Sequence, residues 1–206
     1  LDVSNNTALT SLYVSGNPLS RLNLTGLNSL TGLGIAETQL KLSGLSLPFP
    51  GQLTRLDVDP GQLGRENFSA LTSLTELGIY HRAATDISLP VNSSLQNPIT
   101  SLDITAPQAR SLNFSNYAPG LAQLHIYPGR LERVSGAAKL DSAKFKDLRI
   151  DNNRLPLSQV APLTSAMDLN IPGRNIAVSA QSQVWFESLS ARGTVNLSAQ
   201  IAPERT

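Results

Sequence analysis

A six-residue phrase that recurs along the chain constrains its fold more than any other feature. Its copies begin at residues 9, 30, 53, 74, 99, 121 and 145, so successive copies are 21 to 25 residues apart. This period is typical of repeat proteins, in which each unit buries its apolar side chains against the next. The copies are LTSLYV, LTGLGI, LTRLDV, LTELGI, ITSLDI, LAQLHI and FKDLRI.

The first copy and the residues after it fit the pattern L-x-x-L-x-L-x-x-N-x-L at every fixed position, and the seventh copy fits with Phe145 in place of the first leucine. Leu12 and Val14 alternate with Ser11 and Tyr13, which predicts a short strand with one face turned inward. The pattern predicts a leucine-rich-repeat solenoid. We expect a curved parallel β-sheet on its concave side, an irregular or short helical convex side, and a β-rich C-terminal cap.

The two ends of the chain resemble the leucine-rich repeats of bacterial cell-surface proteins of the internalin-like group. The phrases that carry the resemblance are NNTALTSL and VSGNPLSRLNL near the start and LRIDNNRLPLSQVAPLTSAMDLNIPGRNIAVSAQ at 148–181. The resemblance implies a secreted or cell-surface protein that recognises another macromolecule, most simply a protein. Between 36 and 145 the column occupied by Asn17 in the first repeat reads Thr38, Gly61, Arg82, Pro107 and Gly129. We therefore expect the middle turns to satisfy their backbone groups without that asparagine.

Length and composition fit one repeat domain with a terminal segment. We predict repeats over 1–172, and over 173–206 a cap or the start of a following β region, because an open repeat end exposes core. The expected cap core is Ile176, Val178, Val184, Trp185, Phe186, Val195 and Leu197. Since Leu1 already falls within a repeat, we also expect that residues precede it. The chain has no cysteine, which excludes disulfides and thiol chemistry.

The positions that alternate with the inward leucines form three columns across eight predicted strands, the last of them at 166–171. These 24 positions hold 7 of the 15 carboxylates but only two of the 16 Lys and Arg, so they carry about −5 and the rest of the chain about +6. They also hold three of the four tyrosines and one of the two histidines. We predict ligand contacts from this face, with Tyr80, His125 and Tyr127 as anchors and Tyr13 beside them.

The acidic positions Asp57, Asp59, Glu76 and Asp103 are predicted to lie close together and to select a basic partner. Two interpretations of this group remain open. It could hold a calcium ion, although 57–61 lacks the further acidic ligands of a calcium loop. Alternatively, the carboxylates repel one another and Arg55 relieves that repulsion. We predict no metal site and no cofactor.

No catalytic motif occurs in the chain, so we predict a binding protein and not an enzyme. His125 is expected near Asp103, but a flat sheet offers neither a positioned nucleophile nor an oxyanion hole. The net charge of +1 argues against nucleic acid, and no apolar run is long enough to enter a membrane. The basic run Arg130, Arg133, Lys139, Lys144 and Lys146 is predicted to be a solvated face. Glycan binding, or a spacer role in presenting another domain, remains the alternative function.

Overall fold

The computed structural model divides the chain into two compact units. The first comprises Leu1–His81 and Ser88–Leu102, and the second comprises Arg82–Ile87 and Asp103–Thr206. The residues that the structure describes are 1–47, 50–62, 70–89, 99–127, 129–150, 155–168, 170–171, 173–178 and 196–198.

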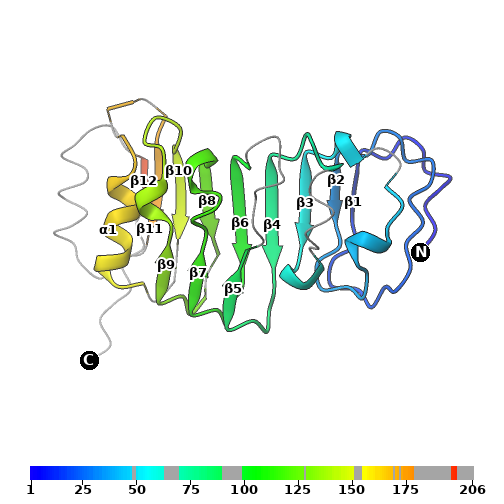
Figure 1. Cartoon of the computed structure of the whole chain (residues 1–206), viewed down its shortest axis with the longest axis horizontal. Helices are drawn as coiled ribbons and strands as arrows, with labels where there is room; N and C mark the ends of the chain where they lie inside the picture. Colours follow the sequence, from blue (N-terminus) through cyan, green and yellow to red (C-terminus); the bar gives the residue numbers. More distant parts are fainter. Residues whose placement is uncertain are drawn as a thin grey trace. The chain divides into compact units, whose positions relative to one another are not determined.

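The first four copies of the repeated phrase form the four neighbouring parallel strands of the first unit, in chain order (Figure 1). These strands are β1 (Ser11–Tyr13), β2 (Gly32–Gly34), β3 (Arg55–Val58) and β4 (Glu76–Tyr80). The recurrence of the phrase therefore predicted both the position and the order of these strands.

One leucine column forms the core of this unit. Leu12 pairs in register with Leu33, Leu33 with Leu56, and Leu56 with Leu77. The last three side chains are at most 1 % exposed. Each therefore contributes on the order of 2 kcal/mol by burial. The alternation predicted from the sequence is confirmed, because each of these leucines faces inward.

The threonine in the repeated phrase extends the backbone ladder before each strand begins. The amide of Thr31 donates to the carbonyl of Thr10 at 2.8 Å, and that of Thr54 donates to Thr31 at 2.8 Å. The hydroxyls of Thr31 and Thr54 donate to the same two carbonyls. Thr75 and Thr100 continue the backbone contacts. The threonine is thus retained for a structural reason that the apolar pattern does not reveal.

The turns after the strands satisfy their carbonyls with different side chains in successive repeats. Asn17 Nδ2 donates to the Val14 carbonyl at 2.9 Å, and Thr38 Oγ1 donates to the Ile35 carbonyl at 2.6 Å. Gln62, which is buried, donates from Nε2 to the carbonyl oxygen of Ile35 at 2.8 Å and to that of Leu40 at 3.1 Å. For the turn after β2, the expectation that groups other than asparagine satisfy the backbone is confirmed.

In the second unit the last three copies of the phrase again form neighbouring strands. They are β6 (Ser101–Thr105), whose last three residues belong to this unit, β8 (Gln123–Ile126) and β10 (Asp147–Ile150). Leu124 pairs with Leu148 and Leu148 with Ile176, and all three side chains are at most 1 % exposed.

A second, smaller sheet, which was not predicted, occurs together with short helical turns between the strands of the main sheet. It has the order β5 (Asp86–Ser88), β7 (Ser111–Asn113) and β9 (Arg133–Ser135), and β7 and β9 are parallel. Gln159 Oε1 accepts the amide of Val134 at 3.0 Å, so a side chain of α1 (Leu157–Ser165) satisfies the outer edge of β9. That contact removes a free donor from a strand edge.

The prediction that 166–171 forms the eighth strand is wrong. The strand beside β10 is β11 (Asn175–Val178), and β12 (Asn196–Ser198) pairs with β11, both in parallel. The residues of 166–171 that the structure describes lie in a turn, where Asp168 Oδ1 accepts the Asn170 amide at 3.0 Å. Of the predicted cap core, Ile176 is buried, whereas the side chains of the other six residues lie outside the described part.

The described residues thus form mostly parallel β-sheet with few helices and no closed barrel. Besides α1, the helices are short 3-10 turns at Leu42–Gly44, Pro50–Gln52, Pro60–Gln62, Ala118–Gly120 and Ala137–Lys139. None of the helices in the described residues has the length and apolar character needed to cross a membrane.

Candidate recognition surface

The side chains that alternate with the buried leucines form the outward face of the main sheet in each unit. In the first unit this face carries Tyr13, Arg55, Asp57, Glu76 and Tyr80, with glycines between them. In the second unit it carries Asp103, His125, Tyr127, Asp147 and Arg149. Except for Tyr127, these residues lie on the strands themselves. Hydrogen bonds between neighbouring strands therefore fix their backbones.

Tyr13 lies over the glycines of the neighbouring strand, and we name this group the tyrosine platform (Tyr13, Gly32 and Gly34). An ideal Cβ built on Gly34 would lie 2.5 Å from Tyr13 Cδ1, and one on Gly32 would lie 2.9 Å from the Tyr13 hydroxyl oxygen. The two glycines therefore leave the space that the ring occupies. Tyr13 nevertheless remains 53 % exposed. The ring is supported on the side of the glycines and open to solvent elsewhere, which favours a binding contact with little entropy to lose.

The acidic side chains of the first unit are arranged around Arg55. Arg55 Nε lies 3.1 Å from Asp57 Oδ1, and its Nη1 lies 3.1 Å from Glu76 Oε2. The interpretation that Arg55 relieves the repulsion is therefore confirmed for these two carboxylates. The Asp59 carboxylate accepts the amide of Gly61 in its own turn and the amide of Glu37 in the turn of the preceding repeat.

Exposure differs among the acidic residues predicted to contact a ligand. Asp57 and Asp103 are 6 % and 8 % exposed, so neither offers the open carboxylate that we expected. The Glu76 side chain is 47 % exposed and remains accessible to a cationic partner. The Asp57 carboxylate lies next to Gly78 and pairs with Arg55, which leaves it little exposed. Asp103 belongs to the second unit.

The second unit holds a group of charges that we name the His125 cluster, in which Asp103 and Asp147 are buried, His125 is partly buried and Arg149 is exposed. His125 Nδ1 lies 3.0 Å from Asp103 Oδ1 on one neighbouring strand, and its Nε2 lies 3.4 Å from Asp147 Oδ2 on the other. Arg149 Nε lies 3.4 Å from Asp147 Oδ1. The predicted proximity of His125 and Asp103 is confirmed. The contact with Asp147 was not predicted from the sequence.

The hydrogen bond with Asp103 raises the pKa of His125 above its ordinary value of 6.5. The negative charges of Asp103 and Asp147 act in the same direction, whereas partial burial and the charge of Arg149 lower that pKa. The net increase means that the environment favours the imidazolium. With both ring nitrogens facing carboxylates, the cluster resembles a structural ion pair more than a catalytic base poised beside a nucleophile.

Tyr127 follows β8 directly and is the exposed aromatic residue of this face, at 48 %. Its amide donates to the Ile104 carbonyl at 2.9 Å, which anchors its backbone to β6. The fourth tyrosine of the chain, Tyr117, lies outside the predicted columns and is 2 % exposed. Tyr117 therefore belongs to the core, and its burial raises the pKa of its hydroxyl group.

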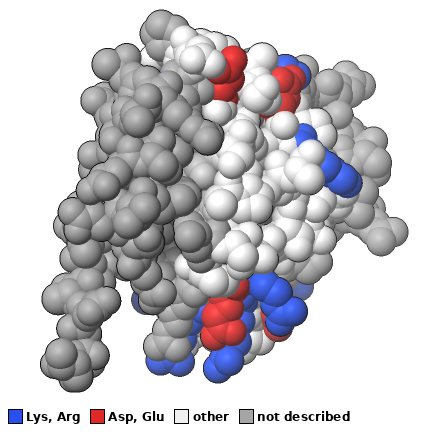
Figure 2. All heavy atoms as spheres, turned by 90° about the vertical axis from the view of Figure 1, so that its left-hand side faces the viewer, with Lys and Arg blue, Asp and Glu red and all other residues white. Residues whose placement is uncertain are grey.

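Charges elsewhere on the second unit are exposed and mixed in sign. The five residues of the predicted basic run are all exposed, and Lys144 pairs with Asp141 at 3.2 Å. Arg110 pairs with Glu132 at 3.7 Å. Figure 2 shows acidic and basic side chains next to one another on the face in view. The charges therefore do not form a patch of one sign. This mixture supports the interpretation of the basic run as a solvated face.

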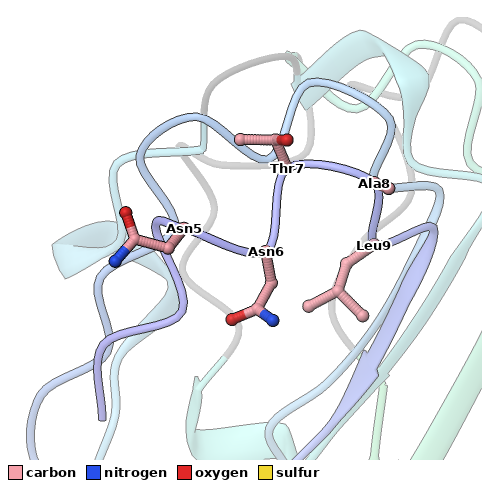
Figure 3. Close-up of a pocket in the computed structure, with 5 residues that line it drawn as sticks. All are labelled: Asn5, Asn6, Thr7, Ala8 and Leu9. Carbon is pink, nitrogen blue, oxygen red and sulfur yellow. The ribbon is translucent and has the colours of Figure 1, made fainter.

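A hollow at the start of the first unit is lined by Asn5, Asn6, Thr7, Ala8 and Leu9 (Figure 3). The side chains of Asn6 and Leu9 point to the same side of the loop, whereas Asn5 points away. The lining comes from one loop and contains no ionisable side chain. Among the residues that the structure describes, no group of three or more His, Cys, Asp or Glu side chains is arranged to hold a metal ion.

Comparison of the chain with protein-family models, with curated proteins and with solved structures finds no match.

Proposed function

We propose that the chain is a leucine-rich-repeat solenoid that binds a protein ligand through the outward face of its sheet. The observation that carries the proposal is the tyrosine platform. A half-exposed aromatic ring rests on glycines that leave room for it. A pre-ordered aromatic side chain at a surface loses little entropy on binding, which is why such residues become interface hot spots.

Support for the solenoid comes from the repeated phrase and its parallel strands. Each unit stacks its copies of the phrase in chain order, and the central leucines of neighbouring strands pair in register and are buried in every strand except β1. This arrangement is expected when a repeat cannot cover its own apolar face. We also propose, from the sequence resemblance alone, that the protein belongs to the internalin-like bacterial group and acts in secreted or cell-surface form.

The chemistry of the face favours a basic protein as the ligand. Glu76 is half-exposed beside Arg55, and the outward columns of the sequence hold more carboxylates than cations. Exposed carboxylates steer a positively charged partner toward the face and fix its orientation. The proposal is one of binding without catalysis.

A second candidate ligand is a glycan, because the open side of Tyr13 offers a flat surface on which a sugar ring could stack. The two ligands respond differently to salt. Attraction between a basic protein and Glu76 weakens as the ionic strength rises, whereas sugar stacking on a tyrosine hardly changes. Salt dependence of binding therefore separates the two proposals.

The test is affinity capture from bacterial and host-cell surface extracts, followed by identification of the bound protein and measurement of its affinity. The wild-type chain is compared with Tyr13→Ala and Tyr127→Ala, and with Gln39→Ala as a control at an exposed turn position. We expect either tyrosine substitution to weaken binding by more than about 2 kcal/mol if that ring is an anchor. Equal affinity for all four chains would refute the proposal and favour a spacer role.

A further inference from the structure

His125 makes two contacts that a neutral imidazole cannot satisfy together. Nδ1 lies 3.0 Å from an oxygen of Asp103, and Nε2 lies 3.4 Å from an oxygen of Asp147. A neutral imidazole carries one N–H and one lone pair, so one of its nitrogens would face a carboxylate without a proton. An imidazolium carries a proton on both nitrogens and presents positive charge to both carboxylates, while Nε2 faces Asp147 as a charge contact and not as a hydrogen bond.

The charges around His125 are those of the His125 cluster. Among the described residues, Asp103 faces it from β6, and Asp147 and Arg149 face it from β10. The adjacent outward side chains on its own chain segment are Gln123, which does not ionise, and Tyr127. Asp103 and Asp147 are 8 % and 6 % exposed. The imidazolium of His125 and the guanidinium of Arg149 thus place positive charge beside two buried carboxylates.

We propose that His125 is a proton-dependent clasp, which as an imidazolium links side chains of β6, β8 and β10 and on deprotonation loses its attraction to Asp147 of β10 and loosens the face around Tyr127. This inference rests on the proposed function only where it concerns ligand binding at Tyr127. The clasp itself depends on the cluster alone.

The contact with Asp147 opens first, for two reasons. It is the longer of the two, and Asp147 retains Arg149 as a second cation at 3.4 Å. Asp103 holds Nδ1 at the shorter distance, so the remaining proton of a neutral ring stays on that nitrogen. Deprotonation thus leaves the side-chain contact between β6 and β8 and weakens the charge contact between β8 and β10, while the backbone ladder of these strands stays in place.

The effect extends to Tyr127 because it follows His125 by two residues on the same segment. The Tyr127 amide donates to the Ile104 carbonyl of β6, next to Asp103 in the chain. A change in how β8 is held between its neighbours therefore alters the environment of the Tyr127 amide. The pH range of this change is that in which His125 titrates.

The test is an NMR titration of the His81→Gln chain, in which His125 is the remaining histidine. We expect two similar imidazole ¹⁵N shifts at pH 6.5, as an imidazolium gives, and a titration midpoint above 6.5. The Tyr127 amide signal should move with the same midpoint. A midpoint at or below 6.5, or the widely separated shifts of a neutral ring at pH 6.5, would overturn the proposal.

Variants separate the clasp from a general effect of charge. Asp147→Asn should lower the His125 midpoint, and Asp103→Asn should lower it further, because Asp103 supplies the largest contribution. Asp141→Asn, which removes an exposed carboxylate paired with Lys144, should leave the midpoint unchanged. An unchanged midpoint in Asp147→Asn would overturn the clasp, and a Tyr127 amide that does not follow the titration would overturn the coupling.

Refutation of the proposed function can be distinguished from refutation of the clasp. If Tyr127→Ala binds the captured protein as well as wild type while His125 titrates as expected, the recognition role of Tyr127 is wrong and the clasp stands. If binding depends on Tyr127 but the His125 midpoint is normal, the recognition role stands and the clasp is wrong.

Discussion

Nδ1 of His125 lies 3.0 Å from Oδ1 of Asp103, although 22 positions separate the two residues in the sequence. That separation is one repeat, and the two strands are neighbours in the main sheet. A sequence distance of one repeat is thereby converted into a contact between adjacent strands. The same conversion places Asp147 on the other side of His125.

The first prediction concerns the pH dependence of stability in the second unit. The folded-state pKa of His125 is raised above 6.5. Its contribution to folding is therefore fully present below pH 6.5 and is lost as the pH rises through the folded-state pKa. We expect urea unfolding of the second unit, followed by NMR signals of β8 and β10, to show higher stability at pH 6 than at pH 8.

His125→Gln provides the control for this prediction, because it removes the titrating group and keeps a side chain that can donate. Its stability difference between pH 6 and pH 8 should be smaller than that of wild type. A wild-type second unit that is more stable at pH 8, or an equal difference in both chains, would contradict the prediction.

The second prediction concerns the fit between Tyr13 and Gly34. Gly34→Ala places a methyl group 2.5 Å from Tyr13 Cδ1, so the ring must move. We expect the free energy of unfolding to fall by about 1 kcal/mol, at the low end for overpacking because the ring can turn toward solvent. Chemical denaturation measures the change, and affinity for the captured ligand should fall with it.

A double-mutant cycle isolates this contact. In a Tyr13→Ala background, Gly34→Ala should cost little, because the clashing ring is gone. Gly44→Ala is the matched control, since a Cβ at that position meets no atom within 4 Å. If Gly34→Ala costs the same with and without Tyr13, the tyrosine platform does not exist as described.

The third prediction concerns Gln62, whose amide group satisfies turn carbonyls of the first unit. Gln62→Leu leaves the carbonyls of Ile35 and Leu40 without this donor and should destabilise the unit by about 2 kcal/mol. Gln62→Glu should be worse at neutral than at acidic pH, because only a protonated carboxyl can donate to those oxygens. Thermal unfolding at two pH values tests both changes, and a pH-independent effect of Gln62→Glu would count against the assignment.

The fourth prediction concerns Arg174, a buried cation of the second unit. Its Nη2 donates to the carbonyls of Ser142 and Ala143 at 3.2 and 3.0 Å, and its Nε donates to that of Asp168 at 3.2 Å. Arg174→Met should lower the free energy of unfolding by about 3 kcal/mol through the loss of charged hydrogen bonds. The exposed Arg133→Met should change it by less than about 0.5 kcal/mol, and similar losses in both variants would contradict the account.

Much of the fold was predictable because the repeated phrase encodes a burial pattern directly. Every copy, including the loose copy that begins at Phe145, becomes a strand with its central leucine inward. The eighth strand was predicted wrongly because 166–171 imitates the phrase in its apolar spacing alone. That segment follows α1, and Arg174 holds its turn by bonding the Asp168 carbonyl.

The candidate site was predictable in position and less so in exposure. Alternation assigns Asp57, Asp103 and Asp147 to the outward face, but it cannot tell that Arg55 and His125 cover them. The support of Tyr13 by Gly34 likewise requires the register of two strands. A clue was present in the sequence, since two glycines in one strand of a repeat protein suggest that a large side chain lies over them.

The most direct test of the central claim is the affinity of the captured protein for the wild-type chain, Tyr13→Ala and Gln39→Ala, measured by titration calorimetry at low and high salt. We predict that Tyr13→Ala weakens binding by more than about 2 kcal/mol, that Gln39→Ala leaves it unchanged, and that salt weakens the wild-type complex. Equal affinity for Tyr13→Ala and wild type would contradict recognition through the tyrosine platform.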